Sequence, residues 1–142
     1  MTVKYLSIDP GLSNGICGYN KRGHLQFSII IKLDELVDFL KQYKRVDTVI
    51  VEDYTIYPNK AKDHIYSDVP TSRAIGRIES WAELNDTKLI KQPAHIKSTG
   101  YKFLGKKPLP KSNPNNHWLD AHAHFTFWAV GNGLIDPRSL LK

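Results

Sequence analysis

The chain has 142 residues, 41% of them hydrophobic, which suits one compact domain with its own core and leaves little room for two full domains. Lysine and arginine number 20 against 14 aspartate and glutamate, giving a net charge of +6. Nucleic acid is therefore a candidate partner, although many small basic proteins bind nothing acidic. The single cysteine, Cys17, excludes an internal disulfide. With no signal pattern and no apolar run of membrane-spanning length, we expect a cytoplasmic protein that does not enter membranes.

The first part of the chain predicts a three-stranded antiparallel meander. Its three apolar runs, separated by short polar turns, are residues 3–9, 15–20 and 24–31. Apolar residues then recur at helical spacing over 33–40, and the run 47–52 (DTVIVE) is typical of a strand buried on both faces. A strand, a crossover helix and another strand imply parallel neighbours within one sheet.

The second part of the chain alternates helices with one more strand. Residues 53–69 carry three tyrosines and mixed charge without a period, which predicts a long surface loop. Pro70 is expected to open a helix reaching residue 85, and residues 87–91 a fifth short strand. A short helix should then run from Pro93 to about Gly100.

Composition argues against a packed element in residues 101–116, which are rich in proline, glycine, asparagine and lysine. The last strong helix is predicted over residues 117–130. The element order predicts an α/β fold of the ribonuclease H-like type, formed by a single domain over residues 1–142. Its five-stranded mixed sheet has three antiparallel strands followed by parallel strands, and helices flank it.

Four polar residues could meet at one site of this fold. Asp9 ends the first strand, Glu52 ends the fourth, and His117 and Asp120 lie one turn apart on a shared face of the last helix. If the first and fourth strands are neighbours, their ends bring Asp9 and Glu52 together. Clustered carboxylates repel one another and are costly to desolvate, so a divalent cation favours such an arrangement. The pattern therefore predicts a metal site.

Each of these residues also has a plainer interpretation. Asp9 precedes Pro-Gly and could serve only as a turn former. Glu52 is followed by Asp53, and alternation along a strand lets only one of the two face the site. The pair on the last helix could simply begin that helix. His124, one turn beyond Asp120, is interpreted as a supporting or core histidine rather than a ligand.

Three stretches, "IDPGLSNGICGY", "VIVEDY" and "NHWLDAHAH", resemble the acidic motifs of RuvC-type Holliday junction resolvases, in the same order and at compatible spacing. The resemblance covers about residues 3–130. It implies that Asp9 is the central metal ligand, Glu52 the ligand from the second motif, and Asp120 with His117 the C-terminal pair. Family members carry either aspartate or histidine where His117 stands. Two Mg²⁺ ions are expected. Mn²⁺ is the alternative, because imidazole suits manganese better than magnesium.

The resemblance implies a metal-dependent endodeoxyribonuclease that resolves Holliday junctions or other branched DNA by symmetric nicking, as a homodimer. The alternative is a ribonuclease H-like nuclease acting on flaps or RNA-containing substrates without junction specificity. A sugar-kinase or actin-like ATPase is disfavoured because those proteins duplicate this fold, and a non-catalytic DNA-binding domain because all four site residues are intact. The apolar residues of helix 70–85 and of the last helix are candidates for the dimer interface or for ordinary core.

A basic segment precedes the last helix. Residues 94–119 contain no acidic residue, and Tyr101 and Phe103 are interspersed among five lysines there: Lys97, Lys102, Lys106, Lys107 and Lys111. This predicts a wall that contacts DNA phosphates, the alternative being a solvated loop. Arg73 and Arg77 could extend that surface. Tyr54 and Tyr57 lie where the family often places an aromatic that stacks on an unpaired base, or they could pack the loop.

Overall fold

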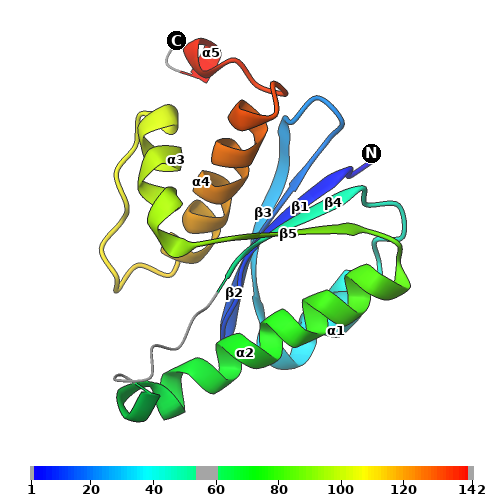
Figure 1. Cartoon of the computed structure of the whole chain (residues 1–142), viewed down its shortest axis with the longest axis vertical. Coiled ribbons are helices and arrows are strands. Elements are labelled where there is room, and N and C mark those ends of the chain that lie inside the picture. The colour runs from blue at the N-terminus through cyan, green and yellow to red at the C-terminus, as the bar shows by residue number, and fades with distance from the viewer. Residues whose placement is uncertain (1, 54–60, 141–142) are drawn as a thin grey trace.

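The structure, a computed structural model, describes the backbone of residues 2–53 and 61–140, and their side chains except those of 61–68. Five strands form one mixed sheet in the order β3-β2-β1-β4-β5 (Figure 1). They are β1 (Tyr5–Asp9), β2 (Ser13–Tyr19), β3 (Leu25–Lys32), β4 (Thr48–Glu52) and β5 (Lys88–Gln92). The first three pair antiparallel, and β4 pairs parallel with both β1 and β5. The predicted ribonuclease H-like sheet is therefore confirmed.

Helices cover both faces of this sheet (Figure 1). On one face lie α1 (Leu36–Leu40), which follows the 3-10 turn η1 (Leu33–Glu35), and the long α2 (Ala61–Leu84). On the other face lie α3 (Lys97–Leu104), entered through η3 (Ala94–Ile96), and α4 (Asn116–Gly131). A last short helix, α5, spans Pro137–Leu140. Within the described residues, no helix is long and apolar enough to cross a membrane.

Side-chain alternation along the central strands builds a core on each face. Leu6 and Ile8 of β1 are fully buried in the core that includes α1 and α2. Between them, Ser7 faces α4 and donates a hydrogen bond to the Ala121 carbonyl oxygen at 2.6 Å. In β4, Val49 and Val51 join the first core and Ile50 joins the second. Burial on both faces explains why β4 is an unbroken apolar run.

The long helix α2 begins earlier than its sequence indicates. Residues 61–69, predicted as a loop, are its first turns, and Pro70 lies inside the helix instead of opening it. Proline removes one backbone donor, but its fixed φ is compatible with a helix, so α2 continues past it at the cost of a hydrogen bond. Beyond Pro70, Ile75, Ile78 and Trp81 are buried in the core and are not interface residues.

The helix α3 ends later than predicted, at Leu104 instead of near Gly100, so residues 101–104 are helical and Tyr101 and Leu104 pack in a core cluster. Gly100 lies inside α3 at its crossing with α4, where a Cβ would overlap the Ala123 carbonyl. Gly105 ends the helix in the left-handed conformation, with φ 65°. A glycine that signals close packing was thus mistaken for a helix end.

The helix α4 packs its aromatic residues against the sheet. Phe125 is fully buried, and its ring stacks on Tyr19 of β2 with 3.5 Å between centroids. Trp128 is partly buried and contacts Tyr5 and Phe125. Phe127 remains partly exposed on the same helix. Most of the aromatic surface that the sequence offered for an interface is therefore core.

Candidate metal centre

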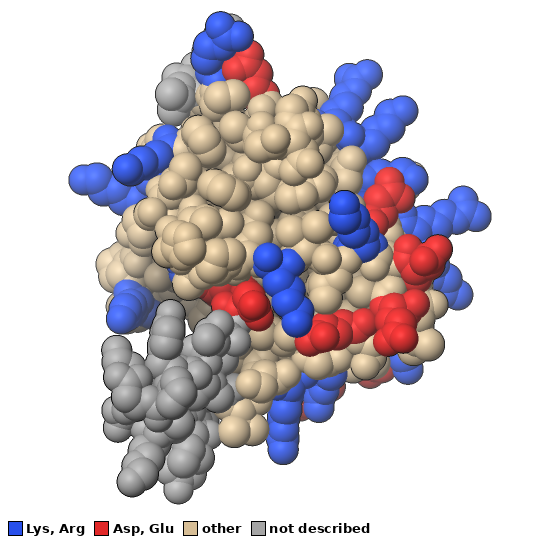
Figure 2. Space-filling view, viewed as in Figure 1, with Lys and Arg blue, Asp and Glu red and all other residues tan. Residues whose placement is uncertain are grey.

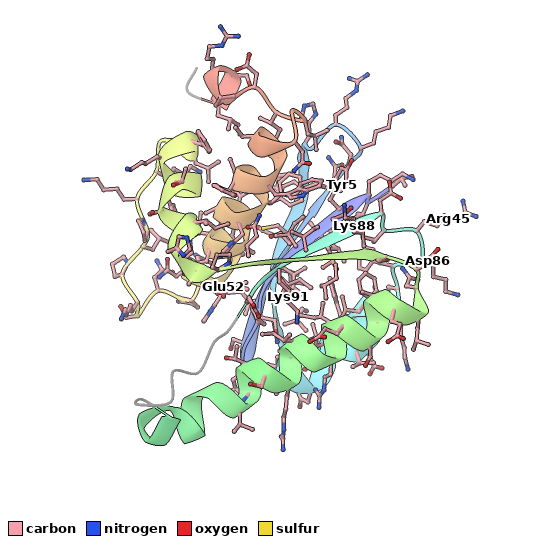
Figure 3. The ribbon with its side chains drawn as sticks, in the orientation of Figure 1. Tyr5, Arg45, Glu52, Asp86, Lys88 and Lys91 are labelled. Atoms are coloured by element: carbon pink, nitrogen blue, oxygen red, sulfur yellow. The ribbon has the colours of Figure 1, made fainter. Side chains whose placement is uncertain are left out.

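The sheet topology brings Asp9 and Glu52 together. Ile8 of β1 pairs with Val51 of β4 in a parallel register, so the residues that follow them end their strands side by side. Figure 3 shows Glu52 at this end of β4, near the point where β5 leads into α3. Both carboxylates are largely buried, with side-chain exposures of 13% for Asp9 and 16% for Glu52. The ends of β1 and β4 thus bring two carboxylates together, and neither strand supplies a positive charge to neutralise them.

The first turn of α4 lies beside this pair because of Gly15. Gly15 is opposite Asp9 in the β1–β2 register, and a Cβ at Gly15 would overlap the backbone of His117 and Trp118. The helix can therefore rest directly on β2. This contact places His117 Nδ1 3.4 Å from Asp9 Oδ2.

Asp120, one turn further along α4, is 17% exposed and has two partners from α3. Its Oδ2 lies 3.2 Å from Lys97 Nζ, and its Oδ1 accepts a hydrogen bond from the Tyr101 hydroxyl at 2.5 Å. The same Lys97 Nζ lies 3.4 Å from Glu52 Oε1. The structure therefore brings all four predicted site residues to one place and adds Lys97 and Tyr101 to them.

These two additions were not apparent from the sequence as site residues. Lys97 was interpreted as part of the phosphate-contacting wall, whereas its ammonium group lies among the carboxylates. Tyr101 was noted only as an aromatic neighbour of the lysines. Their spacing of four residues would have signalled a shared face, had the helix been predicted to continue through Gly100.

A buried polar pair lies behind Glu52. His124 is fully buried, and its Nδ1 is 2.8 Å from Gln92 Oε1. Its Nε2 points at Glu52 Oε1 from 3.6 Å and has no hydrogen-bond partner. Gln92 ends β5 and pairs with Glu52 in the register of the sheet, which is why it reaches His124. His124 supports the site as interpreted from the sequence, and Gln92 is a further residue that the sequence analysis missed.

Charges are strongly coupled at the two strand ends. Burial raises the pKa of Asp9 to about 7, and neighbouring Glu52 and Asp120 add to this while His117 opposes it. Burial also disfavours ionised Glu52, but its contacts with His124 and Asp9 and the charge of Lys97 outweigh burial and lower its pKa to about 2. Without an added cation, the Asp9–Glu52 pair therefore retains a proton up to near-neutral pH.

The basic and hydroxyl groups respond to the same negative charge. The contact with Asp9 raises the pKa of His117. Burial opposes ionisation of Lys97, but Glu52 and Asp120 outweigh it and raise the pKa of that ammonium group. Burial, followed by the hydrogen bond to Asp120, raises the pKa of Tyr101. Lys97 is therefore cationic and Tyr101 protonated at neutral pH.

The donor set fits a hard divalent cation. Among the described residues, no three acidic, histidine or cysteine side chains form a ready metal-binding group, and Lys97 lies between two of the carboxylates. Three carboxylates nevertheless converge, burial and then the neighbouring Glu52 and Asp120 raise the pKa of Asp9, and the buried Nε2 of His124 lacks a partner. Mg²⁺ or Mn²⁺ satisfies these needs if the Lys97 side chain moves aside.

The predicted DNA-contacting residues divide between two surfaces. Four lysines of the segment after Lys97 are exposed: Lys102, Lys106, Lys107 and Lys111. Arg73 and Arg77 lie on α2, on the opposite face of the sheet from α3, and Arg77 donates a hydrogen bond to the Leu33 carbonyl. The two arginines therefore do not continue the lysine segment. Tyr54 and Tyr57 lie outside the described residues.

Figure 2 shows one face of the molecule, with lysine and arginine side chains around much of its edge. Acidic side chains lie on this face in the region where Figure 3 labels Glu52. Of the two consecutive acids that end β4, it is Glu52 that contacts Lys97. The backbone amide of Asp53 donates to the Gln92 carbonyl at 2.7 Å and extends the β4–β5 pairing.

These elements define a ribonuclease H-like α/β fold with a carboxylate-rich edge. It is similar to RuvC of Thermus thermophilus in complex with a Holliday junction substrate, with a TM-score of 0.64 and 14% identity over 92% of this chain and 96% of that one. Another structure of Thermus thermophilus RuvC gives a TM-score of 0.59 and 16% identity over the same shares. No protein-family model and no curated protein matches the sequence. The resemblance to RuvC is thus confirmed at the level of the fold.

Proposed function

We propose that this protein is a metal-dependent endodeoxyribonuclease that nicks branched DNA, with the four-way junction as its substrate. The observation that carries the proposal is the convergence of Asp9, Glu52, Asp120 and His117 at one edge of a RuvC-like sheet. A similar fold holds a Holliday junction substrate in one of the compared structures. Charge adds support, since a net +6 favours a polyanionic substrate.

The carboxylates of Asp9, Glu52 and Asp120 would hold the cations, with His117 as an additional donor. When bound, Mg²⁺ or Mn²⁺ stabilises negative charge on the scissile phosphate and on the departing oxygen. Tyr101 orients Asp120 through its hydrogen bond, so the carboxylate keeps a fixed direction. Lys97 neutralises Glu52 and Asp120 in the metal-free protein and, once displaced from them, becomes a cation available to a DNA phosphate.

The exposed lysines beyond Lys97 would hold the DNA backbone next to this edge. They lie on α3, which supplies Lys97 to the site, and on the segment that leads directly to His117 on α4. Contacts of this kind position DNA without reading its sequence. We therefore assign to them affinity rather than base preference. A homodimer would supply the second site needed for paired nicks.

The decisive experiment compares substrates of equal length: a four-way junction, a linear duplex, a flap and an RNA–DNA hybrid. We expect Mg²⁺- or Mn²⁺-dependent cleavage of the junction, faster than that of every other substrate. Equal cleavage of flap or hybrid would favour a ribonuclease H-like nuclease without junction specificity. The Asp9→Asn protein is the matched control, because it keeps the surface and alters only the central carboxylate.

A further inference from the structure

His124 has an unusual environment for a core histidine. Its ring is fully buried in the third turn of α4, yet one ring nitrogen, Nε2, has no hydrogen-bond partner. It faces Glu52, whose Oε1 lies 3.6 Å away. A buried polar atom without a partner is costly, so natural proteins rarely keep one without a use. The side chain that Nε2 faces belongs to the candidate metal centre.

The partner of the other ring nitrogen determines what Nε2 can do. Nδ1 is 2.8 Å from the carbonyl oxygen of the Gln92 side chain, which can only accept a hydrogen bond. Nδ1 of the neutral ring therefore carries the hydrogen, and Nε2 presents a lone pair. That lone pair faces a carboxylate oxygen, so in the neutral ring two acceptors point at one another. The contact with His124 that lowers the pKa of Glu52 needs a second hydrogen on the ring, at Nε2. A cation between the two acceptors removes the conflict.

A histidine that binds a metal commonly donates its other ring N–H to an oxygen acceptor, which fixes the tautomer and the ring orientation. His124 and Gln92 have this arrangement. Two donors each about 2.1 Å from one ion lie roughly 3.0 to 3.4 Å apart, so the observed separation needs only a small adjustment. The Lys97 ammonium group contacts the same Glu52 oxygen, so it would have to move away for the ion to bind there.

We propose that His124 is a metal ligand of this protein, acting through Nε2 together with Glu52, with Gln92 as the residue that orients its ring. The inference rests on the proposed metal-dependent function and assigns to the site a donor beyond Asp9, Glu52, His117 and Asp120. Imidazole favours transition ions over magnesium. The Glu52 side of the centre should therefore select Mn²⁺ over Mg²⁺.

Pulsed EPR of bound Mn²⁺ tests the assignment without relying on cleavage. The starting protein carries His117→Asp, which removes the imidazole next to Asp9 and keeps a carboxylate there. Its spectrum should still contain couplings to an imidazole nitrogen. They should disappear when His124→Gln is added, and Mn²⁺ binding should weaken by about tenfold or more, with a smaller change for Mg²⁺.

His122→Gln is the matched control for removing a histidine from α4. His122 Nδ1 forms a hydrogen bond with the Tyr19 hydroxyl at 2.6 Å, so this ring interacts with β2 and not with Glu52. This variant, also in the His117→Asp protein, should leave the couplings unchanged. If the His117→Asp protein binds Mn²⁺ at the centre without imidazole couplings, the role of His124 is overturned while the proposed function stands. Failure of the wild-type protein to bind Mn²⁺, with cleavage that survives EDTA, would overturn both.

A second measurement uses the wild-type protein and needs no substitution to fold. In protein labelled with ¹⁵N-histidine, the metal-free NMR spectrum of the neutral ring should show His124 protonated at Nδ1 and bare at Nε2. Added Cd²⁺ should shift the Nε2 resonance strongly. A hydrogen on Nε2 that persists with saturating Cd²⁺ would show instead that His124 donates to Glu52, and the ligand assignment would fail.

Discussion

The Lys97 ammonium group lies 3.2 Å from Asp120 Oδ2, and it also reaches Glu52 Oε1 at 3.4 Å. A lysine from α3 thus joins a carboxylate at the end of β4 to one on α4, where a divalent cation would need the same oxygens. Lys97 acts as an internal cation for the metal-free protein, so metal binding and this ion pair exclude one another.

Replacing Lys97 by methionine should therefore have opposite effects on the two states. Without metal, Lys97→Met leaves two largely buried carboxylates unpaired and should lower the free energy of unfolding by about 1 to 3 kcal/mol. Mn²⁺ should bind more tightly, because no ammonium group competes. Thermal unfolding in EDTA and calorimetric titration measure the two effects. Lys102→Met, at an exposed position of the same helix, is the control. If Lys97→Met binds Mn²⁺ with unchanged affinity, Lys97 does not compete with the metal ion.

The three carboxylates should be individually essential for cleavage. Asp9→Asn, Glu52→Gln and Asp120→Asn should each lower the rate by roughly 10³-fold or more, since each removes a donor to the cations. Junction binding should persist or tighten, because less negative charge faces the phosphates. Asp47→Asn, at the exposed opposite end of β4, should cleave normally. Cleavage by wild-type protein in excess EDTA would exclude the metal mechanism.

Strand positions were well predicted because each depends on local alternation and on apolar runs such as 47–52. The convergence of Asp9 and Glu52 followed from topology, which the short turns and the crossover helix largely determine. Lys97 could not be placed, because its position depends on Gly100 letting α3 pack on α4, a contact between distant segments. Gln92 was missed for the same reason, since its partner His124 comes from another element.

The contribution of Asp9 to the stability of the metal-free protein should fall as pH rises. The ordinary pKa of Asp9 is 3.8 and its folded value is about 7, so between these values the folded state holds a proton that the unfolded chain has released. The resulting stabilisation is complete below the lower value and disappears as pH passes 7, a change of up to a few kcal/mol. The raised pKa of His117 acts in the same direction. Burial lowers the pKa of His122 from 6.5 to about 4, so its contribution runs the other way and grows as pH rises between these values. The lowered pKa of Glu52 acts only below its ordinary value of 4.5.

Thermal unfolding in EDTA between pH 4.5 and 7, a window in which Glu52 stays ionised, measures this effect. The difference in stability between the wild-type and Asp9→Asn proteins isolates the Asp9 contribution, because His122 is present in both, and it should change with pH over this window. Metal binding should strengthen over the same range, because the cation displaces the Asp9 proton. A difference that does not change with pH would mean that Asp9 is already ionised in the folded state.

The lysine segment should contribute affinity independent of DNA sequence. Replacing Lys102, Lys106, Lys107 and Lys111 by alanine should weaken binding to all DNA alike. The dependence of log affinity on log salt should become shallower by up to about one unit for each phosphate that the lysines no longer neutralise. Binding of the Asp9→Asn protein measured over a range of salt concentrations avoids cleavage during the assay. An unchanged slope would make the segment a solvated loop.

Resolution of a junction should require two copies of this chain. A Holliday junction has two equivalent strands to cut, and the described residues form one carboxylate cluster, so paired nicks need a second protomer related by a two-fold axis. The interface must use surfaces other than Ile75, Ile78 and Phe125, which are core residues here. On a cruciform plasmid, the wild-type protein should give linear product within one binding event.

Mixing protomers tests this arrangement directly. Excess Asp9→Asn protein should capture wild-type chains in dimers with a single working site, and the plasmid product should change from linear to singly nicked circles. Asp47→Asn protein, added in the same excess, should leave the linear product intact, which separates inactivation of one site from simple competition. Sedimentation should report a dimer on the junction. A monomer both free and on DNA, with nicked circles even from wild-type protein, would leave a branched-DNA nuclease that cuts one strand at a time.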